Sequence, residues 1–155
     1  MTTQPVLVER SFVVEAPGNR VWSFLRDPAS FSSCIPGVSD VQALDDGTFK
    51  ATVEAKVSIL TARFAMSVRI VDEDPPKRLV AEMAGADEKT GSRLETRNEV
   101  DLREGEGETT EVAFRIDARL SGKLAALGGG MAVKLKSRQM AKAFAAEVKT
   151  RIESV

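Results

Sequence analysis

The stretch SRLETRNEVDLR, residues 92–103, alternates between two kinds of side chain along its whole length. One set of positions carries apolar or small polar residues, and the positions between them carry only arginine, glutamate or aspartate. A period of two is the side-chain period of a β-strand, because successive residues point to opposite faces of a sheet. The stretch therefore predicts a strand with one face in the core, formed by Leu94, Thr96, Asn98, Val100 and Leu102.

The same pattern continues in both directions along the chain. It predicts further strands over residues 6–15, 38–45, 48–58, 61–72, 78–85 and 109–120. Turn signals separate several of them, notably Asp46-Gly47, Asp74-Pro75-Pro76 and the acidic stretch 104–108. With 92–103 they make seven strands joined mostly by short connections, and such connections favour antiparallel pairing.

Helical spacing is found in two places. Residues 17–34 predict two short helices, the first ending near Asp27-Pro28 and the second covering 29–34. After Gly128–Gly130, apolar residues three and four positions apart predict a long amphipathic helix, which at about 1.5 Å per residue spans roughly 34 Å. This order predicts an α+β fold, a curved seven-stranded antiparallel sheet around a long C-terminal helix, in a single domain over residues 1–155.

Composition removes several classes of function. The net charge of the 155 residues is −1, with basic and acidic residues interspersed, so nucleic acid is not an expected partner. A single cysteine cannot form an internal disulfide, and the N-terminus lacks the apolar core of a signal peptide, so we expect a cytoplasmic protein. No apolar run reaches the roughly twenty residues of a membrane span. The chain has no histidine, which excludes histidine-dependent triads and metal sites.

The only cysteine, Cys34, opens the sequence CIPG, and it is not expected to be a nucleophile. Pro36 disfavours helical geometry at Ile35, and Gly37 permits a positive φ, so the block ends the second short helix. A cysteine near a helix C-terminus, without a histidine as base, gains no help in forming a thiolate. A second interpretation places Ile35, Pro36 and Gly37 at the rim where a ligand would enter.

Two acidic clusters and a glycine triplet also invite a functional interpretation. Asp45-Asp46 and Asp72–Asp74 lie at predicted turns, where aspartate is favoured for local hydrogen bonds, so we expect no metal there and no other cofactor. Gly128–Gly130 lacks the Lys-Ser/Thr pair of a phosphate-binding loop. We interpret the triplet as a flexible joint.

The inward positions of the predicted sheet carry few large aromatic residues. Small and flexible side chains are common there, namely Ala51, Ala55, Ala81, Ala118, Met66 and Met83. Such residues predict a gap between sheet and long helix that a lipophilic molecule would fill, because an empty gap loses contacts. The alternative is that helix and sheet pack closer. Thr96 and Asn98 would either orient a ligand or satisfy each other.

Four segments of the chain resemble one known family. They are VEAPGNRVWSFLRDPASFSSCIPGV, DDGTFKATVEAKVS, VDEDPPKRL and SGKLAALGGG. Over about residues 8–150 the chain is similar to the carbon monoxide dehydrogenase G-subunit family of the START-like, polyketide cyclase (SRPBCC) superfamily, whose fold is the helix-grip fold. The resemblance implies a hydrophobic cavity and an accessory role beside a molybdenum-containing hydroxylase, such as carbon monoxide dehydrogenase. Membrane recruitment of that enzyme and handling of a quinone are the roles it suggests.

The function predicted from these observations is non-enzymatic binding of a lipophilic small molecule, such as a quinone, for a molybdenum hydroxylase complex. The predicted ligand-binding residues are Trp22, Ile35, Pro36, Val53, Phe64, Met66, Met83, Thr96, Asn98, Phe114, Ala118, Met140 and Phe144. No catalytic residue is assigned. One alternative is a cyclase or hydratase working through a carboxylate and the pair Thr96/Asn98. Another is a docking or maturation factor with a filled core and no ligand.

The last helix also carries a basic face. Its members are Lys134, Lys136, Arg138, Lys142, Lys149 and Arg151. We expect a solvated surface, with anionic lipid at the inner face of the membrane or an acidic protein as alternative partners. Many relatives carry an apolar C-terminal anchor that is absent before Val155, so direct anchoring is not expected.

Overall fold

The computed structural model describes the backbone of residues 3–44, 46–57 and 59–154, and side chains throughout these ranges except at residues 3, 4, 57 and 127–132. The strands are β1 (Thr3–Val14), β2 (Val38–Ala43), β3 (Phe49–Val57), β4 (Leu60–Asp74), β5 (Arg78–Asp87), β6 (Ser92–Glu104) and β7 (Thr110–Ser121). The helices are α1 (Gly18–Arg26), α2 (Pro28–Ser33) and α3 (Lys123–Glu153). The predicted α+β class and element order are confirmed.

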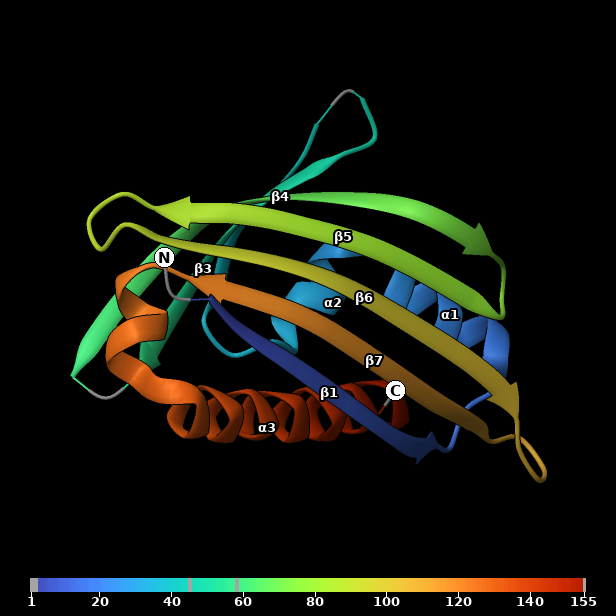
Figure 1. Cartoon of the computed structure of the whole chain (residues 1–155). Coiled ribbons are helices and arrows are strands. Elements are labelled where there is room, and N and C mark those ends of the chain that lie inside the picture. Colours follow the sequence, from blue (N-terminus) through green and yellow to red (C-terminus); the bar gives the residue numbers. More distant parts are fainter. Residues whose placement is uncertain (1–2, 45, 58, 155) are drawn as a thin grey trace.

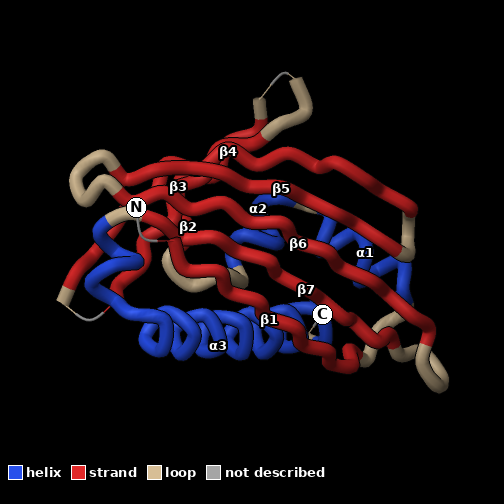
Figure 2. The backbone as a smooth tube through the Cα atoms, in the orientation of Figure 1, coloured by secondary structure: helices blue, strands red, loops and turns tan. Residues whose placement is uncertain are grey.

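The seven strands form one sheet in the order β1-β7-β6-β5-β4-β3-β2, and each neighbouring pair is antiparallel. The sheet curves, with α1 and α2 behind β5 and β6 and α3 running beside β1 (Figure 1). The tube in Figure 2 shows the same arrangement, in which the helices share one side of the sheet. The curved seven-stranded sheet around a long C-terminal helix is therefore as predicted.

The predicted inner face is also correct. Along β4, Ala62, Phe64 and Met66 are buried, and the residues between them are exposed. Val100 and Leu102 of β6 are buried in the same core. Burial fixes the register of strand pairing here, because a slip of one residue would expose each of these apolar side chains to water.

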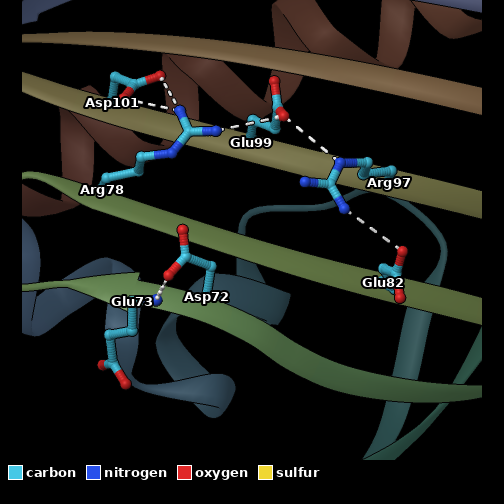
Figure 3. Close-up of polar contacts among 7 residues, drawn as sticks. All are labelled: Asp72, Glu73, Arg78, Glu82, Arg97, Glu99 and Asp101. Carbon is cyan, nitrogen blue, oxygen red and sulfur yellow. Dashed lines mark hydrogen bonds and ion pairs between the residues drawn. The ribbon is translucent and has the colours of Figure 1, made fainter.

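The outer face of the sheet carries interleaved charges, shown for β5 and β6 in Figure 3. Arg78 contacts Asp101 at 3.0 Å and Glu99 at 3.3 Å. Val80 lies on this same outer face, opposite Glu99 and Asp72 in register, and yet it is fully buried. The long charged side chains around it exclude water from an apolar residue, as arginine stems commonly do.

The two short helices are held by local caps. Val21 and Leu25 are the buried residues of α1. The Asp27 side chain accepts a hydrogen bond from the Ser30 N–H at 3.2 Å and so caps α2. Beyond α2, Gly37 has φ +85°, and a Cβ at this position would collide with the Glu54 carbonyl oxygen, so only glycine fits.

The long helix begins earlier than the sequence predicts. It starts at Lys123, so the prediction that it starts after Gly130 was wrong. The Leu124 N–H donates to the buried Ser92 Oγ at 3.0 Å, so a side chain from the first residue of β6 caps the helix where Gly122 cannot. This cap and the burial of Leu124 and Ala125 offset the low helix propensity of the glycine triplet.

The first turns of α3, drawn in orange, point in a different direction from its long C-terminal part (Figure 1). The backbone of Gly128–Gly130 is helical. A flexible joint at this triplet stays a prediction.

The C-terminal end of α3 is tied to β1 and α1. The Glu153 carboxylate accepts a hydrogen bond from the Glu15 N–H at 2.8 Å, and Lys149 Nζ donates to the Val13 carbonyl oxygen at 2.9 Å. The Arg20 guanidinium donates to the Ile152 carbonyl oxygen. These contacts fix this end of the helix against the end of β1.

Candidate functional site

The candidate site is a pocket between the inner face of β2–β6 and the two short helices. Its volume is about 90 Å³. The helical side contributes Leu25, Arg26, Pro28, Phe31, Ser32 and Ile35. The sheet contributes Val38, Val41, Phe49, Ala51, Val68, Ile70, Leu79, Ala81, Met83 and Asn98. Most of this lining is hydrocarbon, which suits an apolar ligand.

The pocket is small in this structure. Pockets for drug-sized ligands commonly enclose about 300–1,000 Å³, and an engineered cavity that binds benzene in another protein encloses about 150 Å³. A bound ring system would therefore have to displace part of the wall. The sizeable cavity predicted from the sequence is not present in this conformation.

The predicted gap between the sheet and α3 is filled by aromatic rings. Phe144 of α3 lies 5.2 Å from Phe31 and 5.5 Å from Phe114, measured between ring centroids. Phe12 stands edge-on to Phe114 at 6.3 Å. No residue of α3 lines the pocket within the described part of the chain, so the open space lies beside this aromatic cluster and under α2.

The helix α2 forms the wall of the pocket that faces the sheet. None of its six residues is fully buried, although Pro28, Phe31 and Ser32 line the pocket. Its C-terminal end is better fixed, because Cys34 is 1% exposed and its Sγ lies 3.5 Å from the Ser30 carbonyl oxygen. Few buried contacts mean a low cost of local displacement. A displacement of α2 would widen the pocket, because three of its residues line it.

Polar groups at the pocket come from both sides. Asn98 Nδ2 donates to Thr96 Oγ1 at 2.9 Å and to the Ala81 carbonyl oxygen at 3.4 Å. The predicted pair Thr96/Asn98 therefore does form, but only Asn98 lines the pocket. On the helical side, Arg26 Nε lies 2.6 Å from Glu73 Oε1 of β4.

The structure brings only three of the predicted ligand-binding residues to this pocket, namely Ile35, Met83 and Asn98. Five others lie buried in the hydrophobic core, namely Val53, Phe64, Met66, Phe114 and Phe144. Trp22 and Ala118 are partly buried against that core, and Met140 is half-buried on α3. Thr96 contacts Asn98 without lining the pocket, and Pro36 is exposed.

Most of the lining was not chosen from the sequence. Val68, Ile70, Leu79 and Ala81 all belong to inward-facing positions, so the period of two does mark them. Phe31 was not assigned to the inside by any strand pattern. The missing information was which part of the inner face lies under α2 and which part lies under α3.

The remaining candidates have structural roles. Burial raises the pKa of the Cys34 thiol, and this opposes thiolate formation. In the second acidic cluster, Asp72 Oδ1 accepts the Glu73 N–H at 3.0 Å (Figure 3). Asp46 accepts from the Thr48 N–H and hydroxyl, and Asp45 lies outside the described residues. Among the described residues, no group of three or more histidine, cysteine, aspartate or glutamate side chains could hold a metal ion.

The basic face of α3 is partly neutralised. Lys149 pairs with Glu153 at 3.0 Å and Arg151 with Glu147 at 3.1 Å. Lys134, Arg138 and Lys142 are exposed further along the helix. In the described part of the chain, no helix has both the length and the hydropathy that crossing a membrane requires.

Comparison with known proteins gives one family match. The model of the CoxG family, which describes the G subunit of carbon monoxide dehydrogenase, matches residues 11–153. None of the curated proteins matches the sequence.

Solved structures share the fold at low sequence identity. A conserved protein from Geobacillus kaustophilus has a TM-score of 0.84 and 20% identity, covering 96% of this chain and 95% of its own. A START superfamily protein from Mycobacterium smegmatis has a TM-score of 0.71 and 15% identity, covering 96% and 97%. The ZhuI aromatase/cyclase from Streptomyces sp. R1128 has a TM-score of 0.69 and 16% identity, covering 97% and 94%. At these identities the likeness shows a START-like fold.

Proposed function

The chain belongs to the CoxG family of carbon monoxide dehydrogenase, and on this premise we propose that it binds a lipophilic small molecule, a quinone or related isoprenoid, as an accessory protein to a molybdenum-containing hydroxylase. The observation that supports the proposal most is the hydrocarbon-lined pocket under α2. A pocket with many apolar groups and few polar ones holds a ligand by removing apolar surface from water.

Binding requires the pocket to widen. Displacing α2 away from β3 and β4 would enlarge the space between Phe31 and Ala51 and admit a ring. Met83 on the opposite wall has a flexible side chain that can repack around different shapes. The ligand's tail would leave the pocket beside the exposed Pro36.

An enzymatic role has less support. A cyclase or hydratase needs a positioned acid or base within hydrogen-bond reach of its substrate. Within the described residues, no aspartate or glutamate lines the pocket, and the carboxylate next to it, Glu73, is paired with Arg26. Asn98 can orient a ligand without exchanging a proton with it. We therefore propose binding without bond formation.

Native mass spectrometry tests the proposal. The purified protein is measured before and after incubation with a lipid extract that contains quinones. A discrete added mass that is lost in Ala81→Phe, which fills the pocket, supports a carrier and identifies its cargo. The matched control is Ala43→Phe at an exposed position of β2, which should keep the ligand. No added mass in either condition would contradict the carrier function and favour a docking role.

A further inference from the structure

Asn98 gives the pocket a polar group of fixed direction. We propose that its amide oxygen makes the pocket prefer ligands that carry a hydrogen-bond donor, so that it binds lipophilic hydroxyl compounds such as phenols and quinols better than quinones. This inference rests on the proposed function, because it names the chemical class that the same pocket accepts.

The first step is the orientation of the amide. The Asn98 amide nitrogen has two hydrogens, and the structure gives both a partner, Thr96 Oγ1 at 2.9 Å and the Ala81 carbonyl oxygen at 3.4 Å. A backbone carbonyl can only accept a hydrogen bond. The side of the amide that faces Ala81 must therefore be the nitrogen, and this settles which atom is left over.

The second step is the atom that remains. The Asn98 oxygen is an acceptor with two lone pairs, and no hydrogen bond to it is formed by the described residues. Asn98 is half-buried and is the only β6 residue in the described lining of the pocket. Among the described residues no fully buried side-chain oxygen lacks a partner, so the Asn98 oxygen is accessible, and a ligand seated against β6 can donate a hydrogen bond to it.

The third step concerns the other polar residues of the lining. The Ser32 hydroxyl can donate or accept, so it satisfies either kind of ligand. The Arg26 guanidinium is engaged with Glu73 on the helical side of the pocket. Arg26 uses only Nε for this contact, and its Nη hydrogens remain donors, so Asn98 is the lining side chain whose free polar atom can only accept.

The consequence is a difference between the two redox forms of one molecule. A quinone presents only carbonyl acceptors, so it leaves the Asn98 oxygen desolvated and unpaired. A quinol presents hydroxyl donors and satisfies it. Loss of a hydrogen bond together with burial of an unpaired acceptor predicts about tenfold weaker binding of the quinone. For a two-electron couple, a tenfold preference for the reduced form raises the potential of the bound couple by about 30 mV.

Isothermal titration calorimetry with three probes that share the naphthalene ring system tests this preference for donors. The probes are 1-naphthol, its methyl ether 1-methoxynaphthalene, and 1,4-naphthoquinone. We expect the wild-type protein to bind 1-naphthol about tenfold more tightly than the other two. Asn98→Leu should bring the three affinities to within about threefold of one another. Gln42→Leu, an amide removed from an exposed position of β2, should keep the wild-type preference.

A second variant guards against a folding defect in Asn98→Leu. Thr96→Val removes one acceptor that orients the amide but keeps a side chain of similar volume, and it should weaken the preference for 1-naphthol. Equal binding of all three probes by the wild-type protein would overturn the donor preference and leave the pocket intact. A preference that survives both Asn98→Leu and Thr96→Val would also overturn it. No binding of any probe would overturn the proposed function as well.

Discussion

Arg26 Nε lies 2.6 Å from Glu73 Oε1, and this ion pair joins the last turn of α1 to β4 beside the pocket. Both side chains are about one-third exposed, so the pair lies at the surface. Pairs of this kind contribute little to global stability. Its position gives it a second role, because it connects the helical wall of the pocket to the sheet.

Glu73→Gln should therefore change ligand exchange more than stability. We expect the free energy of unfolding to fall by less than about 1 kcal/mol, whereas the rates of ligand association and dissociation rise together because α1 is no longer held to β4. Stopped-flow binding of 1-naphthol measures both rates. Glu54→Gln breaks the exposed pair with Arg63, neither of which lines the pocket, and should leave the rates unchanged. Unchanged rates in Glu73→Gln would exclude this role.

Ala81 and Ala118 are both inward-facing alanines, but only Ala81 lines the pocket. Ala81→Leu should fill empty space and leave the free energy of unfolding unchanged or higher, while it weakens ligand binding. Ala118→Leu should cost about 1–3 kcal/mol, because it adds volume where the core is already packed. Urea denaturation compares the two variants. A larger loss of stability in Ala81→Leu than in Ala118→Leu would show that the pocket is not open.

Ser92 is 1% exposed, and its hydroxyl accepts a hydrogen bond from the Leu124 N–H and lies 2.9 Å from the Thr90 hydroxyl oxygen. Ser92→Ala should lower the free energy of unfolding by about 1–2 kcal/mol, since it removes the cap of α3 and leaves a buried N–H unpaired. Hydrogen exchange should accelerate in the first turn of α3. Ser23→Ala removes an exposed hydroxyl bonded to the Asn19 carbonyl and should have little effect. Equal protection of that first turn in Ser92→Ala and the wild-type protein would contradict the cap.

The Glu153 carboxylate accepts the Glu15 N–H and pairs with Lys149, and these contacts lower its pKa from the ordinary value of 4.5. A carboxyl group with a lowered pKa in the folded state contributes stability that is complete above that ordinary value and is lost as the pH falls through the lowered one. Glu153→Gln should be less stable than the wild-type protein at neutral pH, and the difference should disappear in acid. Thermal unfolding across the pH range measures it, with Glu147→Gln as a charge-matched control on the same helix. A difference that persists in acid would contradict this origin.

Burial raises the pKa of Cys34, so its thiol should react slowly with a disulfide reagent in the folded protein and rapidly in urea. Cys34→Ala should lose about 1–2 kcal/mol of stability from the packing around α2, and it should keep its affinity for 1-naphthol. Fast labelling in the native state would show that the thiol is accessible and would reopen a chemical role for it.

The sequence was sufficient for the sheet because its inner and outer faces differ at almost every position. Val100 and Glu99, for example, could be assigned to opposite faces from the pattern alone. Val80 is the exception, since it is buried on the charged face by residues that neighbour it only after the strands pair. The alternation of charges within one strand does not reveal that side chains of a neighbouring strand will bury one of its residues.

The start of α3 and the place of the pocket could not be obtained in this way. The cap on Leu124 comes from Ser92, which is the first residue of β6 and lies 32 residues earlier in the chain. Local propensity therefore favoured a start after the glycines. The pocket depends on how far the Phe144 ring reaches across the sheet and on where α2 rests. Both depend on long-range packing. Inward-facing residues that look alike in the sequence therefore lie partly in the filled core and partly along the open pocket.

The pairing of β1 with β7 has a consequence for the newly made chain. Val14 pairs with Thr110 and Thr3 pairs with Ser121, so about a hundred residues separate the partners. At translation rates of 5–20 residues per second, the apolar side of β1 waits about 5 to 20 seconds after it leaves the ribosome before its partner strand exists. The strand of this sheet that is synthesised first is thus paired with β7 last, and during that interval its charged residues Glu9 and Arg10 oppose association with other chains.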